Sequence, residues 1–336
     1  MSNRSRKIIA FILIICAILL AAGIQFTIGW RPFIGPRART LTSRRFETTA
    51  ARTERGEYLV EKVMGCFFCH SERDWNAPGA PPIEGRKGAG AIFSGGPGKL
   101  FAPNITSDDD SGVGGWSDDA LARAIREGVD NDGRTIFPIM PYQNYRHLSD
   151  EDLASVIVYL RSIPGVHNHV PRSEIRFPVN LLVNNIPQPI TAPVLPPDTS
   201  DAAKRGAYLV QMASCTDCHT PYERGQPIEG LAFAGGFTFN EPSGETTSAN
   251  ITPDPSGISY YDENTFFDVM RNGKVGGRKL NPTMPFALYG RMTDDDLRAM
   301  LAFLRNLTPV KHRVDNTEPP TPCRLCKGRH GLGDKN

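Results

Sequence analysis

Two parts of the chain share one pattern of residues at almost constant spacing, and this internal repeat limits the fold more than any other feature. The segment Gly56-Glu-Tyr-Leu-Val aligns with Gly206-Ala-Tyr-Leu-Val, and CFFCH (66–70) aligns with CTDCH (215–219). The two alignments differ by a single residue in their offset, so insertions between them are few. Two copies of one folded unit explain these matches together.

Further segments match in the same order along both copies. They are Asn104-Ile-Thr with Asn250-Ile-Thr, Trp116 with Tyr261, Gly128 with Gly273, Met140-Pro-Tyr with Met284-Pro-Phe, and Leu148-Ser-Asp-Glu-Asp-Leu with Met292-Thr-Asp-Asp-Asp-Leu. A length of 336 residues is sufficient for two compact domains, each with a core. We therefore predict domains at 50–165 and 201–312, a proline-rich linker at 166–200 laid over them, and a flexible C-terminal tail at 313–336.

Each copy predicts helices joined by loops that are rich in glycine and proline. In the first copy one helix leads into Cys66, a second follows the cap Ser117-Asp-Asp and ends at Gly128, and a third follows Ser149 as far as Arg161. The second copy predicts the last two helices at about 262–272 and 293–306. Apolar residues recur at helical spacing in the third helix of each copy, namely Leu153, Ile157 and Leu160, and Leu297, Leu301 and Leu304. The predicted fold is all-α.

Six of the seven cysteines fall into three CxxC pairs, and only Cys16 stands alone. A CxxC pair alone fits a zinc half-site, a redox disulfide or a haem-attachment site, and the residue that follows separates these alternatives. Histidine follows in the two repeated pairs. Two thiols three positions apart at the start of a helix reach both vinyl-derived arms of one porphyrin, while the next imidazole faces the iron. We predict two covalently attached haem c groups, on Cys66, Cys69 and His70 and on Cys215, Cys218 and His219.

Each copy also offers a methionine as the second axial ligand of the iron. Met140 and Met284 stand in matching Met-Pro-aromatic segments, 70 and 65 residues after the respective histidines. A thioether is a soft donor that favours ferrous iron and raises its potential. Burial in the core is the other role open to a methionine, and it suits Met64, Met212, Met270 and Met300. We predict ligand pairs of His70 with Met140 and His219 with Met284; His147 is the alternative to Met140.

Several other polar residues are weaker candidates. Trp116, Asn104 and Asn250 have the hydrogen-bond donors to bind haem propionates, but residues in such turns and before helix caps are at least as often structural. Asp108-Asp-Asp110 predicts an acidic turn, because it lacks the ligand pattern of a calcium loop. Four histidines in polar, proline-flanked stretches are expected to be exposed: His147, His167, His169 and His312.

The third pair, Cys323-Arg-Leu-Cys326, precedes Lys327, and His330 follows four residues after Cys326. A third haem with a lysine ligand is the less favoured interpretation. We expect a mobile tail whose thiols form a disulfide or bind a metal loosely, because a set of two cysteines and one histidine lacks a fourth zinc ligand.

Residues 8–28 form an apolar stretch of 21 residues without a charge, after the basic residues Arg4, Arg6 and Lys7. As a helix it spans about 30 Å, the thickness of one bilayer core, whereas cleaved signal peptides have shorter cores. We predict an uncleaved anchor in a bacterial inner membrane. Basic residues beyond the stretch oppose the positive-inside rule, but haem c is attached outside the cytoplasm, which places the domains in the periplasm. The net charge of +2, evenly mixed, excludes a nucleic-acid-binding stripe.

The repeated motifs resemble those of the bacterial membrane-bound cytochrome c subunits that serve periplasmic alcohol, aldehyde and gluconate dehydrogenases. The similarity covers about residues 53–310 and includes Arg55-Gly-Glu-Tyr-Leu-Val, CFFCH, Pro103-Asn-Ile-Thr and Met140-Pro-Tyr with their second copies. It implies class I cytochrome c domains and electron transfer, not catalysis on a substrate. It also implies a periplasmic dehydrogenase as electron donor and an oxidase, the quinone pool or a soluble cytochrome as the other redox partner. Those subunits often carry three haem domains and a C-terminal membrane helix, unlike the two domains and N-terminal anchor predicted here.

Two other functions compete with electron transfer between separate proteins. The dihaem subunit of a cbb3-type terminal oxidase also combines an N-terminal helix with two haem domains, although its loop motifs differ. A dihaem peroxidase or thiosulfate dehydrogenase needs an iron with an open or unusual ligand position. The availability of a methionine in both copies argues against such an enzyme.

Overall fold

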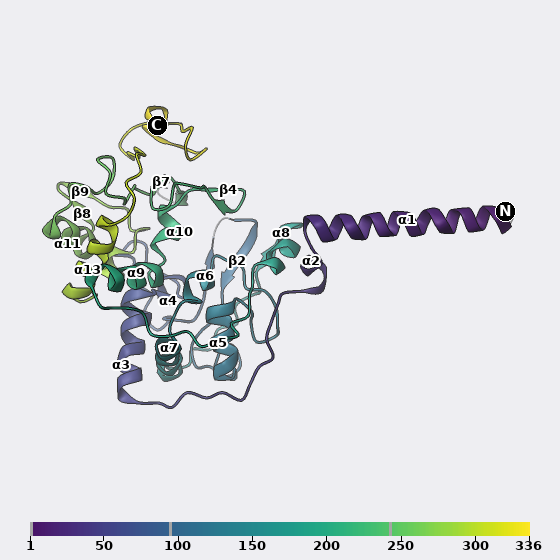
Figure 1. Cartoon of the computed structure of the whole chain (residues 1–336). Helices are drawn as coiled ribbons and strands as arrows, with labels where there is room; N and C mark the ends of the chain where they lie inside the picture. The colour runs from purple at the N-terminus through teal and green to yellow at the C-terminus, as the bar shows by residue number, and fades with distance from the viewer. Residues whose placement is uncertain (1–2, 94–95, 242–243) are drawn as a thin grey trace.

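The computed structural model describes residues 3–93, 96–241 and 244–336. A packed body holds both repeats, and one long helix, α1 (Asn3–Thr27), projects from it (Figure 1). We refer to residues 50–165 as the first repeat and to residues 201–312 as the second repeat.

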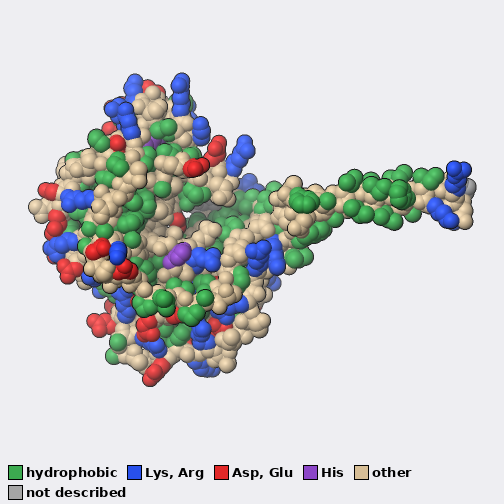
Figure 2. Space-filling model, viewed as in Figure 1, with side chains coloured by type: hydrophobic (Ala, Val, Ile, Leu, Met, Phe, Trp, Pro, Cys, Tyr) green, Lys and Arg blue, Asp and Glu red, His purple; other side chains and the backbone are tan. Residues whose placement is uncertain are grey.

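Helix α1 has the length and composition of a membrane span. Its apolar window has a mean hydropathy of 2.9, and none of its residues is buried in the body. Figure 2 shows an almost wholly hydrophobic rod with Lys and Arg side chains at its free end. The predicted span 8–28 coincides with this helix apart from Ile28, and the helix starts earlier because the basic residues continue its first turns.

An extended strap connects α2 (Arg31–Ile34) with the first repeat and is fixed by buried carboxylates. The Arg39 guanidinium donates to Asp119 Oδ2 and to Glu127 Oε1, both at 2.7 Å, and Thr42 binds the same Asp119 oxygen through its N–H and hydroxyl. Burial alone would raise the pKa of Asp119, but these hydrogen bonds lower it. The strap is therefore part of the folded body.

The first repeat contains the three predicted helices and two short ones. Helix α3 (Ala50–Tyr58) continues through a π-helical turn, η1 (Leu59–Val63), to α4 (Cys66–Cys69); α5 (Asp118–Glu127), α6 (Tyr142–Tyr145) and α7 (Asp150–Ser162) follow. Ser117 and Ser149 cap α5 and α7 by accepting from backbone N–H groups, and Gly128 ends α5 in the left-handed conformation. These helix ends agree with the prediction.

The second repeat has the same order of helices. They are α9 (Ala202–Met212), α10 (Cys215–His219), α11 (Glu263–Asn272), α12 (Phe286–Tyr289) and α13 (Asp294–Arg305). Helix α9 packs against α13 as α3 packs against α7. All the periodic leucines and isoleucine predicted for α7 and α13 are buried, within one hydrophobic cluster that draws residues from both repeats.

Short strands are the main departure from the predicted all-α fold. The described residues form a three-stranded antiparallel sheet of β1 (Ala91–Phe93), β2 (Gly98–Ala102) and β3 (Glu174–Ile175), and four two-stranded hairpins. The hairpins are β4 (Tyr222–Glu223) with β5 (Gln226–Pro227), β6 (Thr238–Glu241) with β7 (Gly244–Thr247), β8 (Lys274–Val275) with β9 (Arg278–Lys279), and β10 (Pro320–Pro322) with β11 (Arg329–Gly331). They lie in the glycine- and proline-rich loops, where two to five residues are too few to show an alternating pattern. The helical scaffold agrees with the prediction, and "all-α" is too strict.

The proline-rich linker lies on the first repeat and reaches the base of α1. Strand β3 of the linker pairs with β2, with Gly98 opposite Ile175. Its short helices α8 (Val179–Leu182) and η2 (Val183–Asn185) contact α2, and Asn185 Nδ2 donates to the carbonyl of Ile28 at 3.1 Å. The linker therefore connects the repeats and also braces the end of the apolar helix.

The two repeats exchange matching hydrogen bonds across their interface. Tyr208 of the second repeat donates to Asp152 Oδ2 of the first at 2.6 Å, and Tyr58 of the first donates to Asp296 Oδ2 of the second. These residues occupy equivalent positions in the repeat, so the contact is approximately two-fold symmetric, as in an isologous dimer. An arginine of the same repeat as each tyrosine or aspartate completes the pairs: Arg55 with Asp152 at 2.7 Å and Arg205 with Asp296 at 2.5 Å.

Removing either tyrosine hydroxyl is expected to weaken this interface. Both acceptors are buried carboxylates, and a hydrogen bond to a charged group contributes about 1.5–3 kcal/mol. We expect Tyr58→Phe and Tyr208→Phe each to lower the free energy of unfolding by about that amount, measured by denaturant titration of the full chain in detergent. Tyr260→Phe is the control, because Tyr260 is 63% exposed. Equal midpoints for all three variants would contradict the assigned role.

Candidate haem-attachment sites

Each CxxCH motif sits on a short helix that starts from a left-handed residue. Gly65 (φ 64°) precedes α4 in the first repeat, and Ser214 (φ 55°) precedes α10 at the equivalent position of the second. The reversal ends the preceding helix and lets the next turn begin in a new direction. It thereby places the first and second cysteines at either end of one helical turn, with the histidine directly after them.

The four thiols of these motifs are free and uncharged. Burial, together with the neighbouring thiol, raises the pKa of Cys66 to about 12, and burial raises that of Cys69 to about 11; Cys215 and Cys218 both reach about 12. A redox-active or metal-binding CxxC pair needs a lowered thiol pKa, because the thiolate is the reactive form. These environments instead suit uncharged sulfur, as in a thioether to a porphyrin.

The two motif histidines are held in the same way. His70 Nδ1 lies 2.7 Å from the carbonyl oxygen of Pro103, and His219 Nδ1 lies 2.8 Å from that of Ala249. A carbonyl only accepts, so each Nδ1 carries the proton, and each Nε2 keeps a lone pair for a metal. Burial lowers the pKa of both imidazoles, which favours the neutral form that can ligate iron.

Met140 and Met284 occupy identical turns that differ from the surroundings of the core methionines. In both, the methionine carbonyl accepts from the N–H two residues later at 2.8 Å, and proline then starts a short helix. Both side chains are partly buried, whereas the four methionines assigned to the core are at most 7% exposed: Met64, Met212, Met270 and Met300. The structure therefore separates the two predicted ligands from the core group.

Tyrosines on the short helices bring the methionine turns against the cysteine motifs. Tyr145 of α6 donates to the carbonyl of Met64 at 3.1 Å, and Tyr289 of α12 donates to that of Ala213 at 2.8 Å. Desolvation, with the nearby Cys66 and Cys69 thiols, raises the pKa of Tyr145 well above its usual value; Cys215 and Cys218 act likewise on Tyr289. Sequence reasoning missed these two tyrosines, although they match in the repeat.

The two motifs lie side by side at the interface between the repeats. Asn144 of α6 donates to both carboxylate oxygens of Asp217, inside the second motif, at 3.0 and 3.1 Å. Conversely, Leu288 of α12 covers Gly65, where a Cβ would lie only 2.6 Å from its side chain. Each methionine-bearing segment thus contacts the motif of the other repeat.

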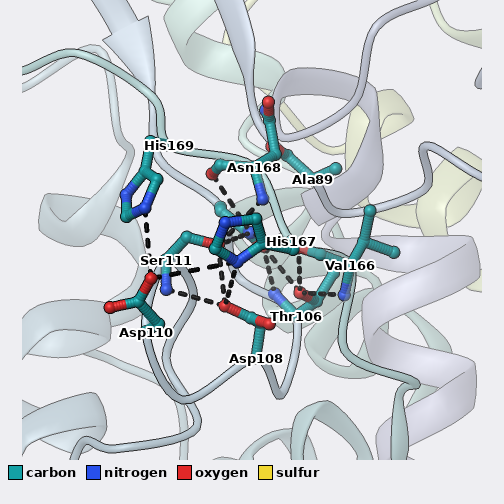
Figure 3. A network of polar contacts seen from close by, with 10 residues as sticks. Ala89, Thr106, Asp108, Asp110, Ser111, Val166, His167, Asn168 and His169 are labelled. Carbon is teal, nitrogen blue, oxygen red and sulfur yellow. Dashed lines mark hydrogen bonds and ion pairs between the residues drawn. The ribbon is translucent and has the colours of Figure 1, made fainter.

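The asparagines proposed for haem propionates have structural roles instead. Asn104 Nδ2 donates to the carbonyl of Val166 at 2.7 Å, and its Oδ1 accepts from the N–H and hydroxyl of Thr106. Figure 3 shows Thr106 and Val166 within this network. Asn250 makes the same contacts with Val310 and Thr252. Their amides are already satisfied within the loop, whereas Trp116 packs against the core and stays a candidate.

Three of the four histidines expected to be exposed are indeed exposed. His147 lies on the surface, and the His167 and His169 side chains are 62% and 67% exposed beside the acidic turn (Figure 3). In that turn Asp108 Oδ1 accepts from the N–H and hydroxyl of Ser111, as expected for a structural acidic turn. The prediction for His312 is wrong: it is fully buried, because the C-terminal segment folds over it.

Comparisons with known proteins agree with these sites. Residues 203–308 match the sequence model of the cytochrome c family. The chain is 30% identical over 77% of its length to a subunit of the nicotinate dehydrogenase of Pseudomonas putida, of which it covers 22%, and 28% identical over 76% to the gluconate 2-dehydrogenase cytochrome c subunit of Pantoea cypripedii, of which it covers 60%. A dihaem cytochrome c-type protein of Cereibacter sphaeroides is 27% identical over 79% of the chain, which covers 89% of it. The chain spans less than two thirds of its dehydrogenase-associated relatives. It is a c-type cytochrome, related in sequence to the cytochrome c subunits of bacterial dehydrogenases.

Proposed function

We propose that this chain is a membrane-anchored dihaem electron-transfer protein with two tandem cytochrome c domains. The observation that carries the proposal is the pair of matched sites, each with two buried neutral thiols and a histidine whose Nδ1 is fixed by a carbonyl. Haem c bound there would supply an iron that cycles between ferrous and ferric states. The domains would span residues 50–165 and 201–312.

The residues of each site fit such a group. The cysteine thiols would form the two thioethers, and His70 and His219 would present Nε2 to the metal. Met140 and Met284 would provide soft thioether sulfur on the other side and stabilise the ferrous form. Since all six positions would then be filled, these residues favour electron transfer over binding of a substrate to the metal.

The anchor and the partners are part of the same proposal. Helix α1 exposes its whole apolar surface, which a bilayer would cover, and its basic first turn would remain in the cytoplasm. The haem domains would then stand in the periplasm. Because several relatives are named as cytochrome subunits of dehydrogenases, we propose a separate periplasmic dehydrogenase as the electron donor. An oxidase, the quinone pool or a soluble cytochrome would complete the path.

The proximity of the two motifs supports transfer within the chain. Cys69 is close enough to Cys218 to contribute to the raised pKa of that thiol, and Asn144 bridges directly to Asp217. The reciprocal tyrosine–aspartate contacts hold this arrangement in register. An electron would therefore pass between the sites without a change in the relative position of the repeats.

The number of covalent haems in cysteine variants tests this assignment. The full-length protein purified from membranes is expected to carry two haem masses, and Cys66→Ser/Cys69→Ser and Cys215→Ser/Cys218→Ser are each expected to carry one. Mass spectrometry of the denatured chain measures this directly, because only covalent haem remains attached. Cys323→Ser/Cys326→Ser is the matched control and is expected to keep two. One haem in the parent chain, or two in either repeat variant, would overturn the assignment.

A further inference from the structure

Four buried side chains outside the haem-attachment sites bring two sulfur and two nitrogen donors together. They are His312, at the end of the second repeat, and Cys323, Cys326 and His330 of the C-terminal segment. Their ligand atoms all lie within 4.8 Å of one another, and none of the four residues is more than 5% exposed. The fourth ligand that the third CxxC pair lacks in sequence is thus supplied in space by His312.

The C-terminal hairpin has the geometry to present three of these ligands. Strand β10 pairs with β11 so that Thr321 faces His330, and the turn between them carries both cysteines. The N–H of Cys323 donates to the carbonyl of Gly328 at 2.9 Å, and Lys327 adopts a left-handed conformation (φ 60°) that reverses the chain after Cys326. This tight turn directs both thiols to the same place as the His330 ring.

His312 reaches the cluster from a loop that both repeats share. Its N–H donates to Ser256 Oγ at 3.0 Å, and its Nδ1 lies 2.8 Å from the carbonyl of Ala234. In the first repeat, Asn168 makes the equivalent contacts, to Ser111 Oγ at 2.8 Å and to the carbonyl of Ala89 at 2.7 Å (Figure 3). The scaffold is therefore the same, but only the second repeat places a metal-binding side chain at this position.

The orientation of the two imidazoles points their free nitrogens into the cluster. The bond to Ala234 fixes the proton of His312 on Nδ1, and its Nε2 lies 3.4 Å from Cys323 Sγ. His330 Nε2 is buried and has no hydrogen-bond partner in the described part of the chain. A buried nitrogen without a partner is costly, and a bound cation would satisfy it.

We propose that this cluster binds one Zn²⁺ ion through Cys323, Cys326, His312 and His330. Two sulfur and two nitrogen donors in a closed, buried set are typical of a structural zinc site, with no position left for a substrate. Binding would displace the two thiol protons and yield Zn–S bonds. A Cys323–Cys326 disulfide, by contrast, would leave His330 Nε2 unsatisfied. The ion would fasten residues 313–336 to the second repeat, against Gly236, where a Cβ would lie 2.7 Å from the His312 ring.

The metal content of the full-length protein tests the proposal. We expect about one zinc per chain beside two irons, measured by inductively coupled plasma mass spectrometry after removal of loosely bound metal. X-ray absorption at the zinc edge is expected to show two sulfur neighbours at about 2.3 Å and two nitrogen neighbours at about 2.0–2.1 Å. Iron reports on the haems, so the two sites are counted independently.

The matched variant is His312→Asn, which installs the residue that the first repeat uses. Asparagine preserves the donor to the Ala234 carbonyl but removes the ligand nitrogen, so the loop is expected to fold. We expect zinc occupancy to fall about tenfold or more, as for loss of a ligand, with two haems retained. Trypsin is expected to cleave faster after Arg324 and Lys327, since the hairpin is no longer fastened. His169→Asn, at an exposed histidine, is expected to keep its zinc.

Several results would overturn the zinc site. A parent chain with a Cys323–Cys326 disulfide and no zinc would do so, as would a third haem mass on these cysteines. Full zinc occupancy in both His312→Asn and Cys326→Ser would show that the metal lies elsewhere. A zinc-free protein with two haems would leave the electron-transfer proposal intact, whereas a zinc-bound protein without haem would refute only that proposal.

Discussion

Replacing Met140 with alanine is expected to lower the reduction potential of the haem on Cys66 and Cys69 and to leave the other haem unchanged. Thioether sulfur stabilises ferrous iron, and axial ligands span about 0.8 V of potential, so losing one is expected to cost on the order of 0.1–0.2 V. The methionine-to-iron absorption of that haem is expected to disappear. Spectroelectrochemical titration of the full-length protein in detergent measures both changes.

Two further substitutions separate ligation from packing. Met140→His is expected to restore a six-coordinate iron at low potential, which a purely structural methionine would not predict. Met292→Leu is the control, because Met292 is a core methionine only 2% exposed and is expected to leave both potentials unchanged. Met284→Ala is expected to affect only the haem on Cys215 and Cys218. An unchanged potential in Met140→Ala would refute the ligand assignment.

The helical scaffold was readable from the sequence because local signals and the repeat agreed. Caps such as Ser117 and Ser149, acidic first turns and the glycine at position 128 define the ends of α5 and α7 within a residue or two. The CxxCH spacing identified the candidate attachment residues, since that chemistry depends on neighbours in sequence. The methionine turns were found through comparison of the two copies.

Features that depend on distant neighbours were not readable in the same way. The short hairpins form in loops whose residues carry no periodic pattern, and their pairing depends on the folded surroundings. The tyrosine–aspartate exchange links positions more than fifty residues apart. His312 was expected to be exposed because its neighbours are polar; only the folding of a segment 11 to 18 residues further along the chain buries it. Extending the repeat alignment to Asn168 and His312 would have marked that position as different.

The helix crossings at Gly56 and Gly206 are expected to be the positions least tolerant of a single methyl group. A Cβ on Gly56 would lie 2.0 Å from the carbonyl oxygen of Ser155 on α7, and a Cβ on Gly206 would lie 1.9 Å from that of Ala299 on α13. These obstacles are backbone atoms, so a rotamer change cannot relieve them. Each helix pair would have to separate, which opens the core on both sides of the crossing.

We expect Gly56→Ala and Gly206→Ala each to lower the free energy of unfolding by about 3 kcal/mol, the upper end of the usual cost of overpacking. This corresponds to a fall of roughly 10 °C in the midpoint of thermal unfolding. The control is Gly277→Ala, where a Cβ meets nothing within 4 Å and the effect is expected to stay within about 0.5 kcal/mol. Because each crossing supports the helix that leads into one motif, Gly56→Ala is expected to release the methionine ligand of the first haem at lower temperature than that of the second, and Gly206→Ala the reverse. Unfolding midpoints equal to that of the control would show that the helices separate at little cost and would refute the close crossing as a source of stability.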